Sequence, residues 1–258
     1  MKDLLFRCSR LSDLMTGLIW LTENQKQLLA KMSEKDKLTE AQAIEYGKLL
    51  EKKNSKELSE SVKNFLIDIY LEYHYGYREE VFTSSMKKGL LLESQAITLT
   101  QQVLGGLRLK NKARKQNEYI IGTCDVVLAN HIEDVKVCEN LKTFFKADLS
   151  KDYMWQGQGY MWLWGIPNYR LIYTLFPDPE EMILDQEKSL YFKFGCNEEN
   201  PDYKRLCYQI RKNNEIIEKM PIDDRIKIFE FQLEEEKIEQ IKSQHARAKE
   251  YLIHNFKL

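Results

Sequence analysis

The stretch GTCDVVLANHIEDVKVC, residues 122–138, decides the fold of this chain. Apolar and β-branched residues lie on both sides of Ala129-Asn130-His131, a run typical of a turn, so the stretch predicts a β-hairpin. Asp125 lies on the first strand, and Asp134 and Lys136 lie on the second. Because side chains two residues apart share one face of a strand, Asp134 and Lys136 point the same way. The hairpin therefore brings together two acids and a lysine.

The segments around the hairpin have the patterns of two helices and one more strand. Residues 87–104 are apolar at helical spacing and end at Gly105-Gly106, which predicts a helix with a glycine stop. Residues 153–164 predict a buried aromatic helix, and residues 169–176 predict a strand. The first strand of the hairpin extends back to residue 119.

Both ends of the chain have helical patterns. Residues 22–75 are charge-rich, with apolar residues at helical spacing, and predict two or three helices. Residues 202–258 have mixed charge and also predict helices; within them residues 225–231 alternate as a strand does, but their flanks favour helix. This order predicts an α/β (α+β) fold in which a central mixed β-sheet is flanked by helices, with extra helices at the N- and C-termini.

The composition is globular and leaves several classes of function without support. The chain has 258 residues and a net charge of −1, so no uniformly basic surface is expected, although a local basic groove stays possible. The five cysteines and four histidines lack metal-ligand spacing, and no phosphate-binding glycine motif is present. No segment approaches the roughly 20 apolar residues of a membrane span, and we expect an intracellular protein.

Three carboxylates and a lysine are candidates for a metal-assisted catalytic site. Magnesium prefers oxygen ligands; Glu93, from the apolar upstream helix, can join Asp125 and Asp134, with the Val135 carbonyl as a neutral ligand. Lys136 can orient or deprotonate an attacking water, or stabilise charge on a phosphate. Two other interpretations stay open, because Asp-x-Lys also occurs as a surface ion pair and Glu93 also suits a solvent-facing position.

The aromatic helix carries a further polar candidate. Tyr153, Gln156 and Tyr160 have the spacing i, i+3 and i+7 and so share one helix face. Gln156 can donate a hydrogen bond to a phosphate or to the attacking water. Gly157 and Gly159 each cost a helix roughly 1 kcal/mol, which suits a helix that lies tight against the sheet or against DNA. An aromatic core helix is the alternative explanation.

Four short motifs follow one another along the chain: Gly89-x-x-x-Glu93, Gly122-Thr123-Cys124-Asp125, Asp134-Val135-Lys136 and Tyr153-x-x-Gln156. Their order and spacing resemble the PD-(D/E)XK nuclease superfamily, and within it the phage-type alkaline exonucleases of the lambda exonuclease and YqaJ-like viral recombinase group. The resemblance covers roughly residues 8–176. Two positions depart from the pattern, because Asp134 stands where many relatives have glutamate and Cys124 stands where the superfamily has proline. Neither departure removes a ligand.

The resemblance implies a restriction-endonuclease-like core in a single nuclease domain, residues 1–258, with a catalytic core of about 1–176 and a helical extension of about 200–258. It also implies a Mg²⁺ cofactor, for which Mn²⁺ substitutes. The implied metal ligands are Glu93, Asp125, Asp134 and the Val135 carbonyl; the implied catalytic residues are Glu93, Asp125, Asp134, Lys136 and Gln156, with Tyr153 supporting the phosphate contact.

Other residues are candidates for binding DNA phosphates. The family's N-terminal serine motif, which contributes to binding a 5′-phosphate, is similar to the segment containing Ser9, with Arg7 and Arg10 as further candidates. Thr123 places a hydroxyl two residues before Asp125. Basic side chains near the Glu93 helix and the loop after it predict a phosphate-binding surface, although a solvated polar loop fits as well. These basic residues are Lys87, Lys88, Arg108, Lys110 and Lys112.

The function implied is resection of double-stranded DNA ends, 5′ to 3′, in phage-type recombination by single-strand annealing. The expected partners are duplex ends, a single-strand annealing protein and further copies of the chain in a trimeric ring, with no membrane, in a bacterial cytoplasm. Two alternatives remain: a restriction or repair endonuclease with the same site, and a non-catalytic DNA-binding recombination protein.

Overall fold

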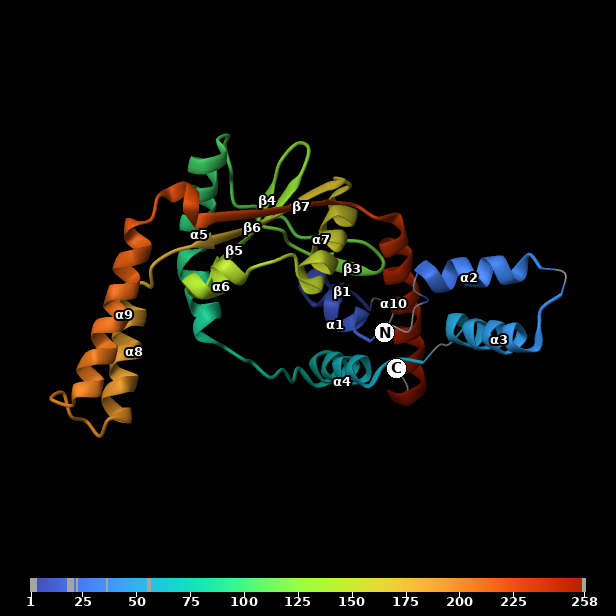
Figure 1. Cartoon of the computed structure of the whole chain (residues 1–258), viewed down its shortest axis with the longest axis horizontal. Coiled ribbons are helices and arrows are strands. Elements are labelled where there is room, and N and C mark those ends of the chain that lie inside the picture. Colours follow the sequence, from blue (N-terminus) through green and yellow to red (C-terminus); the bar gives the residue numbers. More distant parts are fainter. Residues whose placement is uncertain (1–3, 18–20, 22, 36, 55–56, 257–258) are drawn as a thin grey trace. The chain divides into compact units, whose positions relative to one another are not determined.

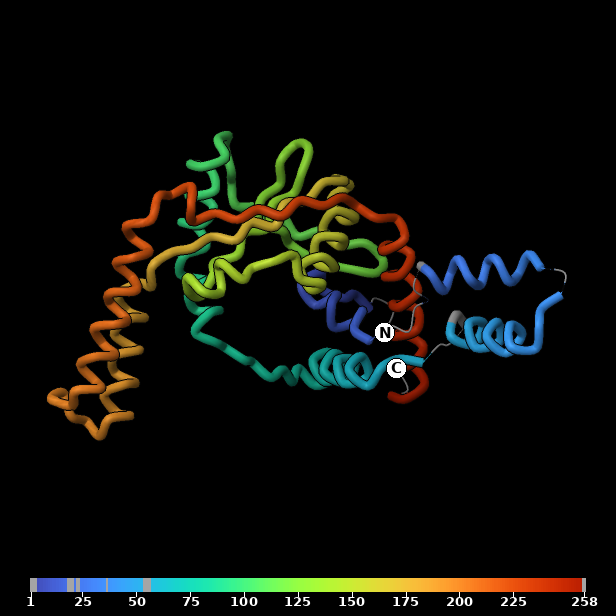
Figure 2. Tube along the Cα trace, viewed as in Figure 1, coloured from blue at the N-terminus to red at the C-terminus, as the bar shows by residue number. Residues whose placement is uncertain are grey.

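The computed structural model describes residues 4–17, 21, 23–35, 37–54 and 57–256. The chain divides into two compact units. The larger unit comprises Leu5–Ser9 and Glu79–Ile238, and the smaller comprises Met1–Leu4, Arg10–Arg78 and Glu239–Leu258. Figure 1 labels the helices and strands, and Figure 2 follows the path of the chain through them.

The centre of the larger unit is a mixed sheet of four strands in the order β4-β5-β6-β7. The central strands β5 and β6 are parallel, and the outer two pair antiparallel to them. The connection from β5 to β6 runs through α6 and α7, as a parallel pair requires. The predicted mixed sheet flanked by helices is confirmed. The elements are β4 (Val126–Val127), β5 (Ile132–Cys138), β6 (Asn168–Leu175), β7 (Ile226–Gln232), α6 (Leu141–Lys146) and α7 (Lys151–Trp164).

A second, smaller sheet has the order β1-β3-β2. Its strands are β1 (Phe6–Arg7), β3 (Ile120–Gly122) and β2 (Lys115–Gln116). The strand expected from residue 119 onward is therefore broken, because β3 and β4 belong to different sheets. Between β3 and β4, the backbone carbonyls accept hydrogen bonds from Asn111 and not from a neighbouring strand. The Asn111 N–H donates to the Asp125 carbonyl at 2.7 Å, and its side-chain amide donates to the Cys124 carbonyl at 3.0 Å. Asp125 thus lies at the joint between the two sheets.

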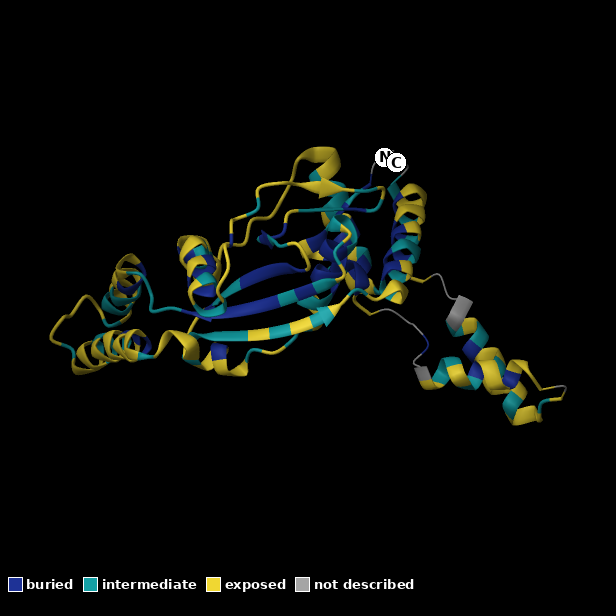
Figure 3. Ribbon diagram, turned by 90° about the horizontal axis from the view of Figure 1, so that it is seen from above, coloured by how far each residue is buried: buried dark blue, intermediate teal, exposed yellow. Residues whose placement is uncertain are grey.

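Strand β7 corrects the expectation of helix at residues 225–231. It pairs with β6 along its whole length, from Asn168 opposite Gln232 to Thr174 opposite Ile226. Its exposure alternates residue by residue, as Figure 3 shows for this outer strand. The alternation was the correct signal, and the helical flanks misled because strand pairing depends on a partner about 60 residues earlier in the chain.

Two helices cover opposite faces of the four-stranded sheet. Helix α5 (Ser84–Leu104) begins three residues earlier than expected, capped by Thr83, and packs Ala96 and Ile97 against Val135. Helix α7 lies on the other face, where Gly157 approaches Tyr169. Both helices end at glycines, Gly105 and Gly165.

A helical hairpin, α8 (Glu180–Lys193) and α9 (Pro201–Lys219), follows β6 and leads through η2 (Ile222–Arg225) into β7. Helix was expected only from residue 202, so α8 is an addition. Arg211 joins the two helices by ion pairs to Glu180 at 3.2 Å and Glu187 at 2.7 Å. Figure 1 shows α8 and α9 side by side.

Helix α7 packs so closely on the sheet that Gly157 predicts a measurable effect. A Cβ atom there would lie 2.5 Å from Cζ of Phe231, which is closer than carbon atoms can approach. We expect Gly157→Ala to lower the free energy of unfolding by about 1–3 kcal/mol, as overpacking does. Chemical denaturation followed by circular dichroism measures this change.

Gly89→Ala on α5 is the matched control, because a Cβ at Gly89 meets nothing within 4 Å. That change should stabilise the protein by up to about 1 kcal/mol, since alanine is the better helix former. Equal effects of the two substitutions would contradict the packing of α7. Of the two reasons offered for a glycine at position 157, close packing on the sheet and close packing on DNA, the first is sufficient.

The smaller unit is helical, and the described part of residues 22–75, where two or three helices were expected, contains α2, α3 and α4. Within it, Gln244 donates to the Leu14 carbonyl at 3.1 Å and His245 lies 2.8 Å from the Leu4 carbonyl, which ties the last helix to the N-terminal segment. None of the helices in the described residues combines the length and hydropathy of a membrane span. Its helices are α1 (Leu11–Met15), α2 (Glu23–Ser33), α3 (Glu40–Asn54) and α4 (Glu60–Tyr75); η1 (Cys8–Arg10) and α10 (Glu235–Phe256) each begin in the larger unit and end in the smaller one.

Candidate active site

Glu93 and Asp125 meet at a single lysine. The Nζ atom of Lys110 donates to Oδ1 of Asp125 at 2.9 Å and also contacts Oε1 of Glu93. Glu93 lies on α5 next to the buried Leu92, at the rim of the helix face that covers the sheet. The three residues therefore come from a helix, a loop and the joint before β4.

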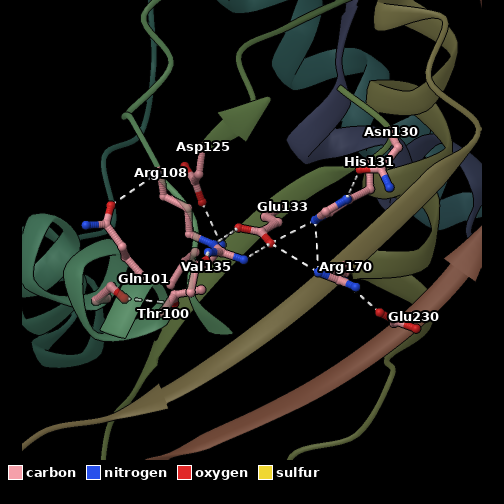
Figure 4. A network of polar contacts seen from close by, with 12 residues as sticks. Thr100, Gln101, Arg108, Asp125, Asn130, His131, Glu133, Val135, Arg170 and Glu230 are labelled. Carbon is pink, nitrogen blue, oxygen red and sulfur yellow. Dashed lines mark hydrogen bonds and ion pairs between the residues drawn. The ribbon is translucent and has the colours of Figure 1, made fainter. Parts of the chain in front are cut away.

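Asp125 is held on both of its oxygens. Its Oδ2 accepts a hydrogen bond from the backbone N–H of Val135 at 2.8 Å, which Figure 4 shows, and its Oδ1 accepts the bond from Lys110. The Val135 N–H reaches Asp125 because β4 and β5 pair antiparallel, with Val126 opposite Glu133. The predicted convergence of the hairpin strands is confirmed for Asp125. The carbonyl of Val135 as a metal ligand stays a prediction.

Asp134 and Lys136 lie on one face of β5, as their spacing predicts, and they form a largely buried ion pair. Lys136 Nζ lies 2.6 Å from Asp134 Oδ2, and the side chain of Asp134 is only 3% exposed. Despite this short distance Oδ2 accepts no hydrogen bond, so the approach of the ammonium lacks hydrogen-bond geometry. The pKa of Asp134 is raised to about 6 as a net result: burial raises it most, the charge of Lys136 lowers it, and the charge of Asp125 raises it. The two aspartates are thus close enough to share one electrostatic environment.

Lys136 is protonated in this arrangement. Burial alone lowers the pKa of Lys136, but the charge of Asp134 outweighs it and the net pKa lies above the usual value. Its ammonium also lies 4.9 Å from the ring centre of Tyr153, a cation–π contact that restrains the side chain. A protonated lysine can stabilise phosphate charge but cannot accept a proton, so the structure favours the predicted role in stabilising phosphate charge over the predicted role in deprotonating water.

Helix α7 brings Gln156 to the same acids. The amide nitrogen of Gln156 donates to Oδ1 of Asp134 at 3.4 Å and to the hydroxyl of Tyr160 at 3.3 Å, and the side chain is buried. Tyr160 in turn lies against Gly122, where a Cβ would be 2.7 Å from its ring. The glycine of the Gly-Thr-Cys-Asp motif is therefore needed for close packing under α7.

Strand β3 of the small sheet ends three residues before Asp125, and β1 pairs beside β3. Phe6 pairs with Ile120 and Arg7 with Ile121, which places Cys8 against Gly122. Ser9 follows Cys8 and Thr123 follows Gly122, and both are exposed. Arg10 belongs to the smaller unit, where it pairs with Asp13 and lies 4.9 Å from the ring centre of Phe65.

Two of the basic residues expected on a phosphate-binding surface are buried, and we correct that expectation for them. Lys88 is 1% exposed and ion-paired with Asp178 at 2.8 Å. Arg108 is buried against Glu133, with Nε 2.6 Å from Oε2. Neither can reach a DNA phosphate, because each charge is neutralised inside the protein. The other three are Lys87, paired with Asp185 at 2.7 Å, Lys110 at the acids, and Lys112, which is exposed.

A buried polar network on the opposite face of β5 was not foreseen (Figure 4). Glu133 is fully buried and forms an ion pair with Arg108. Its carboxylate also lies 2.9 Å from the His131 ring and 3.7 Å from the Arg170 guanidinium. Burial alone raises the pKa of Glu133, but the hydrogen bonds from Arg108 and His131 hold it below the usual range. The sequence carries one sign of this network: Glu133 lies in the buried stretch Ile132–Cys138, where a carboxylate needs a charged or hydrogen-bonding partner.

The donor atoms fit a hard divalent cation. All are oxygens: Glu93 Oε1 and Asp125 Oδ1 already bracket a positive charge, and Asp134 Oδ2 is buried without a hydrogen bond. Within the described residues no three acids, histidines or cysteines are grouped tightly enough to hold an ion as they stand. In this arrangement Lys110 pairs with Glu93 and Asp125, and Lys136 pairs with Asp134.

No family model and no curated protein matches this sequence. Solved structures are similar along nearly the whole chain. A phage related exonuclease from Haemophilus somnus 129PT has a TM-score of 0.69 at 23% identity, covering 99% of this chain and 96% of that chain. The alkaline exonuclease LHK-Exo from Laribacter hongkongensis has a TM-score of 0.57 at 11% identity, covering 98% and 90%, and its complex with dAMP has 0.54 at 12%, covering 98% and 93%. The chain therefore has the fold of these exonucleases.

Proposed function

We propose that this protein is a Mg²⁺-dependent deoxyribonuclease that resects the 5′-ended strand at the ends of duplex DNA. The observation that supports it most is that Glu93 and Asp125 meet at Lys110 while the buried Asp134, paired with Lys136, lies near Asp125. The exonuclease fold of its structural neighbours supports it independently. The direction of cleavage and a role in recombination rest on the resemblance of the four motifs.

Glu93, Asp125 and Asp134 are the residues that would hold the cation, with Mn²⁺ able to replace Mg²⁺. Such a cation, when bound, stabilises charge on the phosphate and lowers the pKa of an attacking water. The Val135 N–H holds Asp125 in its orientation, and the Gln156 amide does the same for Asp134. The protein therefore positions two ligands from backbone and helix before any substrate arrives.

Lys136 supplies a positive charge to the scissile phosphate. Its pairing with Asp134 keeps it protonated, and the Tyr153 ring limits where the ammonium can lie. An ammonium aimed at the charge that develops in the transition state lowers the barrier without reorganising at the moment of reaction. Proton removal from the attacking water is then left to a group other than Lys136.

We assign the DNA end to the ends of the neighbouring parallel strands β1 and β3. Ser9 and Thr123 follow these strands and are exposed, Thr123 lies two residues before Asp125, and each offers a hydroxyl to a terminal phosphate. The structure of LHK-Exo with dAMP shows that a protein of this fold binds a nucleoside monophosphate. We extend that type of binding to this chain. The resemblance supports two further proposals, assembly into a trimeric ring and a single-strand annealing protein as partner.

A DNA degradation assay tests the proposed function. With Mg²⁺, the protein should release mononucleotides from the 5′ ends of linear duplex DNA and leave closed circular DNA intact. Lys136→Met, which keeps the length of the side chain, should lower kcat by about 10²- to 10³-fold, the usual effect of losing one transition-state donor. Lys142→Met, at an exposed lysine of α6, is the matched control and should retain full activity.

Three results would contradict the proposal. Cleavage of closed circular DNA would make the protein an endonuclease. DNA binding without hydrolysis would make it a non-catalytic recombination protein. Undiminished activity of Lys136→Met would remove this lysine from the site.

A further inference from the structure

Lys110 occupies the place between two carboxylates that the proposed function assigns to a metal ion. Its ammonium contacts Glu93 Oε1 and Asp125 Oδ1, the latter at 2.9 Å. The three side chains carry a net charge of −1 together. A lysine ammonium is thus already acting as the cation of this pair.

Lys110 and a divalent cation need the same oxygen atom. Asp125 has two carboxylate oxygens, and Oδ2 is engaged by the Val135 N–H inside the β4–β5 pairing. Oδ1 is the oxygen that faces Glu93 through the shared ammonium, so it is the one placed for a cation that both acids hold, and it accepts from Lys110. An ammonium and a divalent cation on one oxygen repel each other strongly at such short distances. One of them must leave when the other binds.

The backbone on both sides of Lys110 is fixed, so the exchange falls on its side chain alone. Two residues before it, the Arg108 N–H donates to Gln101 at 2.9 Å and the guanidinium is buried against Glu133. One residue after it, the Asn111 N–H donates to the Asp125 carbonyl at 2.7 Å. The four-carbon stem of lysine can rotate without moving this loop.

Lys110 is also the more exchangeable of the two lysines at the acids. Its side chain is 36% exposed, and its carboxylate partners Glu93 and Asp125 are 42% and 16% exposed. Lys136, by contrast, is bound to the buried Asp134 and restrained by Tyr153. The same loop carries the exposed residues Lys112 and Arg114, so a displaced Lys110 ammonium adds to a basic segment of the surface.

We propose that Lys110 is an exchangeable internal counter-ion: it holds Glu93 and Asp125 together without metal, and on metal binding it is displaced to a phosphate of the DNA backbone. This inference rests on the proposed function. It adds to that function a metal-dependent DNA contact, because the positive charge of Lys110 is available to DNA only after the exchange.

The first experiment measures metal binding to the DNA-free, metal-stripped protein by calorimetric titration with Mn²⁺. Lys110→Met should bind Mn²⁺ about tenfold more tightly than the wild type, since it no longer competes for Asp125 Oδ1; tenfold corresponds to about 1.4 kcal/mol. Lys112→Met removes the same charge two residues away and should change the affinity by less than about threefold.

The second experiment measures binding of duplex ends by fluorescence anisotropy, in Ca²⁺ and separately in EDTA. Lys110→Met should weaken binding about fivefold to tenfold in Ca²⁺ and leave it unchanged in EDTA, because only the displaced ammonium contacts a phosphate. If Lys110 only repelled the metal and never contacted DNA, Lys110→Met would change DNA affinity by the same factor in Ca²⁺ and in EDTA.

The outcomes separate the two proposals. Absence of Mn²⁺ binding by the wild type would overturn the metal centre and with it the proposed function. Mn²⁺ binding by the wild type with the same affinity as Lys110→Met would overturn the exchange alone. An equal loss of DNA affinity in Ca²⁺ and EDTA would also overturn it.

Discussion

Replacing Asp134 by asparagine should reduce DNA hydrolysis by about 10³-fold or more while the protein stays folded. Asparagine has the shape of aspartate but no charge, so it cannot supply the buried anionic oxygen Oδ2, which accepts no hydrogen bond. It can still accept the Gln156 hydrogen bond at Oδ1. The loss is therefore one of chemistry and not of packing.

Two measurements check this result. The rate of nucleotide release from linear duplex DNA in Mg²⁺ gives the activity, and thermal unfolding without metal gives the stability. Asp185→Asn is the matched control, because Asp185 is an exposed aspartate on α8 that pairs with Lys87. It should keep full activity. Retention of more than a tenth of wild-type activity by Asp134→Asn would exclude Asp134 as a ligand of the essential cation.

Arg108→Met should lower the free energy of unfolding by about 3–5 kcal/mol, the usual effect of removing one partner of a buried ion pair. The substitution leaves the fully buried Glu133 without the two hydrogen bonds that Arg108 Nε and Nη2 donate, at 2.6 and 2.9 Å. His131 and Arg170 remain near it, but each faces other partners as well, Asn130 and Glu230. Burial then raises the pKa of Glu133 instead of the pair holding it down.

Chemical denaturation of Arg108→Met beside Arg211→Met tests this prediction. Arg211 also makes a bidentate ion pair, with Glu187, but it lies on the surface, so its loss should cost no more than about 1 kcal/mol. The double variant Arg108→Met/Glu133→Gln should recover part of the stability, because it removes the uncompensated charge. Similar losses for the two arginines would mean that the Glu133 network is not a buried charge cluster in solution.

Local pattern was sufficient for much of the larger unit. Period-two spacing placed Asp134 and Lys136 on one face of β5, and they form an ion pair at 2.6 Å. The glycine stop at Gly105 and the aromatic pattern of α7 also predicted the observed elements. Each of these features depends on residues within one turn or one strand, so the sequence carries the information locally.

Features that depend on partners far apart in the chain could not be predicted from the sequence. Strand β7 is a strand because β6 pairs with it, and its flanking residues pointed to helix. The break between β3 and β4 exists because Asn111 takes the backbone of Cys124 and Asp125. In both cases the competing local preference is weak and the long-range hydrogen bonds decide.

The fate of the charged residues shows the same division. Sequence by itself determined which acids lie on which strand or helix, and that Asp134 and Lys136 share a face. Only the tertiary structure decided that Arg108 is buried against Glu133 and that Lys110 joins Glu93 to Asp125. A basic residue in a loop is equally suited to solvent, to DNA or to a carboxylate. Folding decides which of these a basic residue contacts, because its charge can be buried only where the fold places an opposite charge beside it.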